Sequence, residues 1–274
     1  MAMKVGFIGL GVQGKYLAIN LAQAGYDLLV YDVRPEPLQE LAAAGARIAM
    51  SCREVGAHAE VVETCVLNDA QTEEVVNGEN GVLKGAKPGT TLVIHSTIRP
   101  STIERLAAVA AKQGVEVMDV PVSGSEIGAR NKTMSYMAGG SAAGFAKCRP
   151  LFETSGSKVR HTGGLGTGIR AKLAHQLVIT VNMLAAYEGF RLGLEAGLDP
   201  EILTTAINDG GAQSKMADNW AKRVIRPASR PVFYKDLQVI LEFGHELGLS
   251  LPGAALAQQM LDAMIPADEK EAGR

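Results

Sequence analysis

The sequence is poor in cysteine and has no excess of charge of either sign. Its three cysteines, Cys52, Cys65 and Cys148, are far apart and form no Cys-x-x-Cys motif. They therefore predict neither a disulfide framework nor a structural zinc site, and we expect no bound metal and a cytoplasmic, reducing location. The 27 Lys and Arg residues against 29 Asp and Glu residues leave a net charge of -2, which argues against nucleic acid as a partner.

Long apolar runs are missing as well. No segment has the roughly eighteen consecutive apolar residues that a membrane-spanning helix needs, so we expect no membrane partner. The first residues, Met1 to Lys4, lead at once into a strand-like segment, so we expect no signal peptide. What is present is enough apolar side chain for a folded core, since 47% of the residues are hydrophobic and 20% are charged.

Up to about residue 160, β-rich segments alternate with amphipathic helical segments, as in βαβ units. The expected strands cover residues 4–8, 27–31, 61–67, 91–95, 115–120, 134–138 and 158–161. The expected helices cover residues 13–24, 37–44, 72–77, 101–113 and 142–154. This pattern predicts an α/β fold in which a doubly wound Rossmann domain comes first.

The pattern changes at the glycine-rich segment 163–168, where β-rich runs stop. We place a domain boundary there, with an NAD(P)-binding Rossmann domain at 1–163 and an all-α substrate and oligomerisation domain at 164–274. The segment 169–196 is apolar on all sides and predicts a long interdomain helix buried between domains or subunits. Further helices are expected to begin at 199–200 and to cover 212–224, 233–247 and 253–264.

A glycine motif follows the first expected strand. Gly9-Leu10-Gly11-Val12-Gln13-Gly14 matches Gly-x-Gly-x-x-Gly and opens an amphipathic helix. The first glycine allows a tight turn, the second lets backbone N–H groups approach a pyrophosphate, and the third allows close packing of helix on strand. A glycine turn can be purely structural, but the acid that ends the second strand, Asp32, favours dinucleotide binding because it can accept hydrogen bonds from ribose hydroxyls.

The segment Asp32-Val33-Arg34 also bears on the choice of dinucleotide. A carboxylate at residue 32 repels the 2′-phosphate of NADP, so NAD is favoured. Arg34 leaves NADP open, since an arginine just after this strand can hold the phosphate. Its simpler interpretation is a solvated turn residue before a proline.

Four segments, in order and in register, resemble the β-hydroxyacid dehydrogenase family, which is typified by 3-hydroxyisobutyrate dehydrogenase and includes reductases of tartronate semialdehyde and glyoxylate. They are the glycine loop with Asn20 and Leu21 on its helix, residues 119–129, residues 166–172, and Lys235-Asp236-Leu237. The resemblance spans nearly the whole chain. It implies an NAD(P)-dependent oxidoreductase that moves a hydride between a nicotinamide and a small 3-hydroxy acid, or that reduces the corresponding semialdehyde.

The resemblance also implies roles for residues at the ends of several strands. Ser123 and Gly124 would hold the substrate carboxylate, and Ser125 stands where the family usually repeats glycine. The residues implied at the cofactor are Leu67, Asn68, Thr97 and Lys235. His95, by strand alternation, points away from Ser96 and is interpreted as a core residue. A Ser-Gly turn that binds no ligand remains the structural alternative for Ser123.

Lys172 corresponds to the family's catalytic lysine, which exchanges a proton with the substrate's β-hydroxyl group as hydride leaves the same carbon. Gly166 and Gly168 would let the backbone pass close to the nucleotide. A lysine can serve in this way where burial and a nearby cation disfavour its charged form. The alternative is a lysine in a salt bridge on the helix surface.

Two departures from the family pattern concern the substrate. Many members carry asparagine at the positions of His175 and Gln176; the glutamine keeps an amide, whereas the histidine either contacts the substrate or packs at the domain interface. Three arginines, Arg223, Arg226 and Arg230, could recognise a second acidic group or form a solvated basic turn.

Other functions remain open at this point. The chain could be a catalytically silent dinucleotide-binding scaffold, or an imine reductase or other carbonyl reductase on the same fold. The joint presence of Ser123, Lys172 and Lys235 favours the dehydrogenase. Its expected partners are a small anionic substrate and further copies of itself, in a homodimer or homotetramer.

Overall fold

The computed structural model describes residues 2–220 and 227–266, and the chain divides into two compact units, Met1–Lys172 and Leu173–Arg274. The first unit is a Rossmann-like α/β domain and the second is helical, as the sequence predicts. The division between them falls inside a helix rather than in a loop.

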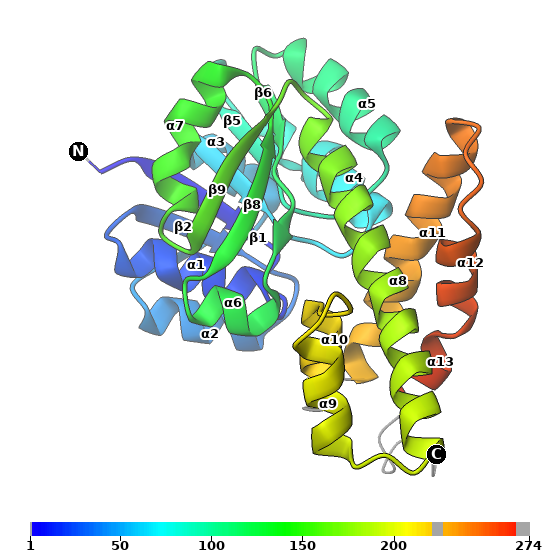
Figure 1. Cartoon of the computed structure of the whole chain (residues 1–274). Helices are drawn as coiled ribbons and strands as arrows, with labels where there is room; N and C mark the ends of the chain where they lie inside the picture. Colours follow the sequence, from blue (N-terminus) through cyan, green and yellow to red (C-terminus); the bar gives the residue numbers. More distant parts are fainter. Residues whose placement is uncertain (1, 221–226, 267–274) are drawn as a thin grey trace. The chain divides into compact units, whose positions relative to one another are not determined.

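The first unit is built on a nine-stranded sheet with the order β3-β2-β1-β4-β5-β6-β8-β7, in which β9 lies beside β8 (Figure 1). The strands are β1 (Lys4–Ile8), β2 (Asp27–Tyr31), β3 (Arg47–Ile48), β4 (Val61–Thr64), β5 (Thr91–Ile94), β6 (Glu116–Asp119), β7 (Val122–Ser123), β8 (Met134–Gly139) and β9 (Gly156–Gly163). The pairs from β3 to β6 are parallel, whereas β8 runs antiparallel to β6 and β7. The chain order reverses beside β1, which is where open α/β sheets bind ligands at the carboxyl ends of their strands.

Helices cover both faces of this sheet. They are α1 (Gly14–Gln23), α2 (Pro35–Ala43), α3 (Cys52–His58), α4 (Asp69–Asn77), α5 (Pro100–Ala111), α6 (Ser125–Arg130) and α7 (Ala142–Phe152), with a short 3-10 turn, η1 (Val82–Lys84). Apolar side chains of α1, α2 and α7 pack with Val5 and Phe7 of β1, and α3 lies against the other side of that strand. Four short elements are not predicted from the sequence, because each has too few residues to show a hydrophobic period. They are α3, α6, β3 and β7.

A buried asparagine joins distant parts of the first unit. The Nδ2 atom of Asn20, on α1, donates to the carbonyl of Ala129 and to the hydroxyl of Ser155, each at 2.9 Å. Asn20 is only 4% exposed, so water cannot replace these bonds readily. The side chain therefore fixes α1 against α6 and against the turn that precedes β9.

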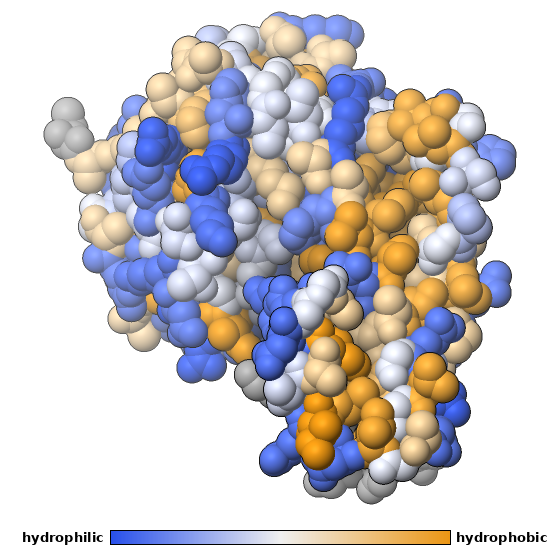
Figure 2. Space-filling model, in the orientation of Figure 1, coloured by the Kyte–Doolittle hydropathy of each residue, from blue (hydrophilic) through white to orange (hydrophobic). Residues whose placement is uncertain are grey.

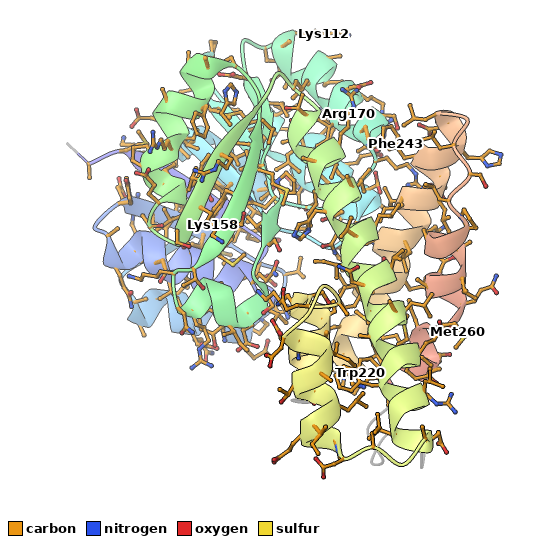
Figure 3. The ribbon with its side chains drawn as sticks, viewed as in Figure 1. Lys112, Lys158, Arg170, Trp220, Phe243 and Met260 are labelled. Atoms are coloured by element: carbon orange, nitrogen blue, oxygen red, sulfur yellow. The ribbon has the colours of Figure 1, made fainter. Side chains whose placement is uncertain are left out.

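The second unit is helical. Its helices are the greater part of α8 (Thr167–Glu195), then α9 (Pro200–Asn208), α10 (Lys215–Trp220), α11 (Arg230–Glu246), α12 (Pro252–Gln259) and α13 (Leu261–Met264), with a 3-10 turn, η2 (Pro227–Ser229). Trp220, labelled in Figure 3, stacks on Phe190 and meets Tyr187 edge to face. The helix expected at 212–224 begins at Lys215, and its residues 221–224 lie outside the described residues. The single helix expected at 253–264 is divided in two at Met260.

By length and composition alone, α8 could cross a membrane. Only 33% of the apolar 18-residue stretch that passes this test is buried within the chain. A core helix of a soluble protein passes the same test, so this property does not decide where α8 lies. Three apolar side chains of α8, Val178, Leu192 and Leu194, are exposed.

We expect Asn20→Ala to lower the free energy of unfolding by about 1–3 kcal/mol, because the variant leaves a buried carbonyl and a buried hydroxyl without their donor. Urea denaturation measures this change. The control Asn77→Ala, at the exposed end of α4, should stay within about 0.5 kcal/mol of the wild type. Equal effects of the two substitutions would contradict a special role for Asn20.

Candidate active site

The three glycines of the nucleotide motif are required for different reasons. Gly9 has φ +92°, and a Cβ atom there would lie 2.5 Å from the carbonyl oxygen of Cys65. A Cβ on Gly14 would lie 2.1 Å from the carbonyl oxygen of Gly9. A Cβ on Gly11, by contrast, would meet no protein atom within 4 Å. Gly9 and Gly14 are therefore needed for packing, whereas Gly11 keeps open the space into which a pyrophosphate would come.

Asp32 follows β2 and is joined to this loop by hydrogen bonds. Its Oδ2 atom accepts from the backbone N–H of Leu10 at 2.6 Å, and its Oδ1 atom accepts from the backbone N–H of Arg34 at 2.9 Å and from its Nε at 3.1 Å. Burial alone would raise the pKa of Asp32, but the hydrogen bonds from Arg34 and Leu10 together hold it below its usual value. Asp32 is thus a buried carboxylate at the place where a dinucleotide ribose would be recognised.

The remaining residues predicted in this loop are more open. The side chains of Val12 and Val33 are exposed, that of Gln13 is half-buried, and Leu10 belongs to the core. The guanidinium group of Arg34 is largely exposed, although its Nη2 atom donates to the carbonyl of Leu10 at 3.1 Å. Arg34 therefore binds the loop and Asp32 rather than pointing away from them.

The carboxyl ends of β4 and β5 lie side by side and carry the next predicted residues. The hydroxyl of Ser96 donates to the carbonyl of Val66 at 2.7 Å and accepts from its N–H at 3.1 Å. Asn68 caps α4 by accepting from the N–H of Gln71 at 2.9 Å. Leu67 is 50% exposed, and Thr97 is half-buried. Ser96, which the sequence-based predictions name only in relation to His95, is the residue that ties these two strand ends together.

The predicted substrate loop follows β6. Ser123 ends β7 and is half-buried, Gly124 has φ +147°, and Ser125 has φ +58° and an exposed side chain. A positive φ is unfavourable for a residue with a Cβ atom, which explains why glycine suits residue 125 as well. Ser125 shapes the turn at a cost in backbone strain and leaves its hydroxyl in solvent.

Asp119, at the end of β6, holds the start of α8. Its Oδ1 accepts from the N–H of Gly166 and its Oδ2 from the N–H of Ile169, both at 2.7 Å. Burial raises the pKa of Asp119 above its usual value, and these backbone N–H groups oppose the shift. The carboxylate thereby caps the helix from a neighbouring strand and satisfies donors that a helix start leaves unpaired.

Gly168 and Lys172 lie in the turns that follow. A Cβ on Gly168 would stand 2.3 Å from the carbonyl oxygen of Asp119, so this glycine is needed for close packing against the protein's own backbone. The sequence-based prediction for Gly166 and Gly168 is instead that they let the backbone pass close to the nucleotide. Lys172, one turn into α8, is 6% exposed. A lysine so deeply buried does not fit the alternative of a solvated salt bridge on the helix surface.

In the second unit, Asp236 connects the predicted residues. Its Oδ2 accepts from Nε2 of Gln176 at 2.7 Å, and its Oδ1 pairs with Nζ of Lys235 at 2.8 Å. Nδ1 of His175 lies 3.3 Å from Oε1 of Gln176. Asp236 belongs to a motif that the sequence shows, but the sequence alone assigns it no role. Only a structure could reveal the contact, because Gln176 and Asp236 are sixty positions apart.

The predicted arginines are only partly described. Arg223 and Arg226 lie outside the described residues. Nη1 of Arg230 pairs with Oδ1 of Asp262 at 3.2 Å, so this arginine already has an acidic partner within its own unit.

The first unit fits a dinucleotide. The open position at Gly11, the buried carboxylate of Asp32 and the paired ends of β4 and β5 surround the switch point of the sheet. Within residues 2–220 and 227–266, no cluster of His, Cys, Asp and Glu could hold a metal ion. Cys52, Cys65 and Cys148 are free thiols, and burial raises the pKa of Cys65 and of Cys148 to about 12, so neither is a thiolate at neutral pH.

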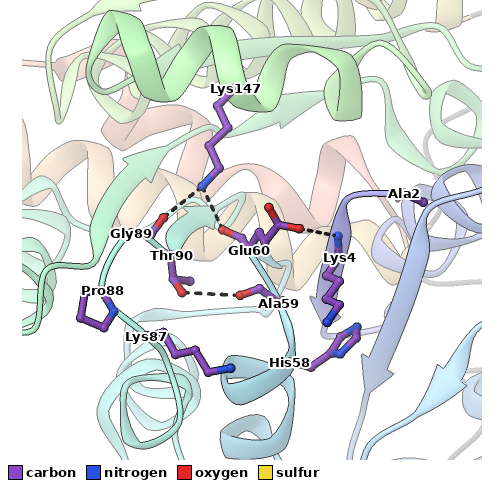
Figure 4. A pocket seen from close by; sticks show the side chains of 10 residues that line it. All are labelled: Ala2, Lys4, His58, Ala59, Glu60, Lys87, Pro88, Gly89, Thr90 and Lys147. Carbon is purple, nitrogen blue, oxygen red and sulfur yellow. Dashed lines mark hydrogen bonds between the residues drawn. The ribbon is translucent and has the colours of Figure 1, made fainter.

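A cavity of about 650 Å³ opens at the other end of the strands, beside the amino ends of β1, β4 and β5 (Figure 4). Lys147 reaches it from α7, and its ammonium group donates to the carbonyls of Glu60 and Gly89 and to the hydroxyl of Thr91, each at 3.1 Å. These three acceptors account for the ammonium donors, so Lys147 binds strand ends together there.

Comparison with known proteins supports this interpretation. Residues 4–163 match the family model described as the NAD binding domain of 6-phosphogluconate dehydrogenase, and residues 166–274 match the one described as NAD-binding of NADP-dependent 3-hydroxyisobutyrate dehydrogenase. The chain is 37% identical to 2-hydroxy-3-oxopropionate reductase of Escherichia coli over 265 residues, which cover 95% of this chain and 90% of the relative. It is also 37% identical to a probable mitochondrial 3-hydroxyisobutyrate dehydrogenase of Dictyostelium discoideum, covering 95% and 85%. The solved structure of Mycobacterium tuberculosis 3-hydroxyisobutyrate dehydrogenase with L-serine is similar, with a TM-score of 0.87 and 26% identity over 96% of this chain and 94% of that one.

We expect Gly11→Ala to fold with wild-type stability but to bind NAD about tenfold more weakly or worse, a loss of about 1.4 kcal/mol, since its methyl group enters open space that the pyrophosphate needs. Thermal unfolding and equilibrium dialysis measure the two quantities. The matched variant Gly14→Ala should instead lose stability, by about 1–3 kcal/mol, because its Cβ overlaps the carbonyl of Gly9. Unchanged NAD binding by Gly11→Ala would place the nucleotide elsewhere.

Proposed function

The chain belongs to the 3-hydroxyisobutyrate dehydrogenase family of NAD(P)-dependent oxidoreductases, and on this premise we propose that it interconverts a small 3-hydroxy acid and the corresponding semialdehyde, with Lys172 as general acid and base. The observation that carries the proposal is the position of Lys172. It is buried one turn into α8, and Asp119 anchors the start of that helix to the strand that leads into Ser123.

The proposed chemistry separates a hydride from a proton. A bound nicotinamide dinucleotide supplies the hydride acceptor, or the donor in the reverse direction. In the oxidising direction, the neutral Nζ of Lys172 takes the proton from the hydroxyl oxygen of the substrate while the carbon–oxygen bond becomes a carbonyl. In the reducing direction, the ammonium returns that proton to the carbonyl oxygen.

Ser123 and Gly124 are proposed to hold the carboxylate of the substrate. A serine hydroxyl and backbone N–H groups on a loop after a strand are suitable donors for an anionic oxygen. The two relatives at 37% identity are named for acting on 2-hydroxy-3-oxopropionate and 3-hydroxyisobutyrate, both small acids of this kind. For His175 and Gln176 we retain a substrate contact as a proposal, with the Gln176 amide oriented by Asp236.

NAD remains our proposed cofactor. The buried carboxylate of Asp32 would face the 2′-phosphate of NADP, and the Arg34 side chain binds that carboxylate and the carbonyl of Leu10. Thr97, Leu67, Asn68 and Lys235 keep their proposed places near the cofactor.

We further propose a homo-oligomer, in a cytoplasmic setting, that associates through the helices of the second unit. Figure 2 shows apolar side chains gathered over these helices. Leu192 on α8 is 75% exposed and Ile202 on α9 is 65% exposed. Exposed apolar patches of this kind mark association surfaces.

A panel of 3-hydroxy acids, and of semialdehydes in the reverse direction, assayed by absorbance with both NAD and NADP, tests this function. We expect turnover of at least one small acid and a preference for NAD of about tenfold or more, which corresponds to about 1.4 kcal/mol. Binding of the dinucleotide without turnover of any substrate would favour a silent scaffold. A tenfold preference for NADP would show that Arg34 outweighs Asp32.

We expect Lys172→Ala to lower kcat by about 10²- to 10⁴-fold while NAD binds normally, because a proton-transfer group is lost from an intact cofactor site. The control is Lys158→Ala on β9, an exposed lysine labelled in Figure 3, which should retain wild-type turnover. Steady-state kinetics and NAD titration provide both readings. Near-normal turnover by Lys172→Ala would remove this residue from the mechanism.

A further inference from the structure

A buried pair of ionisable side chains, Glu63 and His95, lies inside the first unit and has no part in the proposed chemistry. Oε2 of Glu63 lies 2.7 Å from Nε2 of His95, and the two side chains are 3% and 0% exposed. Nδ1 of His95 lies 2.7 Å from the carbonyl oxygen of Val120. A buried carboxylate inside an apolar strand is costly, so its presence there calls for a role beyond filling space.

The imidazole spans three neighbouring strands. Glu63 is on β4, His95 directly follows β5, and Val120 directly follows β6, and these strands are adjacent in the sheet. A carbonyl oxygen can only accept, so Nδ1 carries the hydrogen and donates to Val120. The His95 side chain thus links β4 and β6, the two strands that flank β5.

The bond from His95 to Val120 lies just before the predicted substrate loop in the chain. Val120 leads through Pro121, which has no N–H group, into Val122 and Ser123 of the predicted substrate loop. The neighbouring residue of His95 is Ser96, which binds both the N–H and the carbonyl of Val66. The tether therefore acts at the point where three strands deliver their functional loops.

The surroundings of His95 keep the imidazole in a single orientation. Its ring stacks on Phe7 at 6.3 Å between centroids and meets the edges of Tyr136 at 5.8 Å and Phe152 at 6.1 Å. Oε1 of Glu63 accepts no hydrogen bond from the described residues. All of the carboxylate's hydrogen bonding within the described chain is thus directed to His95.

We propose that the Glu63–His95 pair is a positioning device for the substrate loop: Glu63 orients His95, and His95 holds the carbonyl of Val120 so that Ser123 faces the acid group of the substrate. This inference rests on the proposed function, in which Ser123 binds that acid. His95 and Glu63 are positioning residues and touch neither substrate nor cofactor in this proposal.

Stability and positioning can be separated with a double variant. His95→Phe alone fits the aromatic surroundings but leaves Val120 without its donor and Glu63 as a buried charge without a partner, so we expect it to lower both Tm and kcat/KM. In Glu63→Leu/His95→Phe the buried charge is gone, and apolar replacement of a buried pair is commonly neutral for stability. We expect this double variant to regain most of the lost Tm, with the unpaired carbonyl of Val120 as the remaining cost.

The kinetic result then tests the proposal. The double variant should keep wild-type affinity for NAD, while its kcat/KM for the hydroxy acid stays about tenfold or more below wild type, since small misplacements of a binding group cost rate. Glu63→Gln should be close to wild type, because its amide can donate to Nε2 and leave the Nδ1 hydrogen for Val120. The core control Leu41→Ala, on α2 and remote from the pair, should lose stability without losing kcat/KM.

Hydrogen–deuterium exchange of the segment 120–130 gives a measurement that needs no substrate. Exchange should be faster in the double variant than in wild type or Glu63→Gln. Wild-type kcat/KM together with wild-type exchange in the double variant would overturn the positioning role. If the wild-type protein turns over no acid of the panel, the proposed function fails, and unchanged exchange would separately refute the tether.

Discussion

The proposed active site depends on one interaction, in which the carboxylate of Asp119 binds backbone N–H groups at the start of α8. It is a strand residue that caps a helix, and both of its oxygens are committed to backbone N–H groups of α8. Because a helix start has unpaired donors that point along its axis, a buried acceptor fixes both the position and the direction of the helix. The location of Lys172 follows from this, since the lysine is only one turn further along.

The remaining parts of the site are arranged by the sheet. Glycine packing sets the loop after β1, a shared hydroxyl joins the ends of β4 and β5, and a buried histidine joins β5 to β6. Each device acts at or next to the last backbone hydrogen bonds between these strands, at their carboxyl ends. Polar side chains in such positions are expensive to bury, but when they are fully paired they give a loop one geometry.

The sequence was sufficient for features that are local in the chain. Lys4–Ile8 and Asp27–Tyr31 were predicted with their observed ends, because apolar runs there are bounded by glycine and by polar residues. The glycine motif was equally readable, since its spacing expresses the geometry of one turn. The two-residue strands β3 and β7 were missed because they have no period of their own.

Contacts between distant segments were beyond such reasoning. Glu63 is an acid in a run of apolar residues, which is a detectable anomaly, but nothing in one sequence shows that His95 receives it. Gln176 and Asp236 present the same difficulty, as does the role of Asp119 in binding residues nearly fifty positions later. The need for glycine at residue 168 could not be predicted either, because it depends on the close approach of the backbone of Asp119.

Because α8 runs across the division between the two units, it limits where this protein can be cut and rebuilt. The family models meet between residues 163 and 166, yet the donors that Asp119 needs come from Gly166 and Ile169. A recombination joint placed at the glycine turn would therefore pair a foreign helix with a native cap. An exchange that carries the first turns of α8 with the nucleotide half preserves this contact, which places the useful joint inside the helix rather than at the glycine turn.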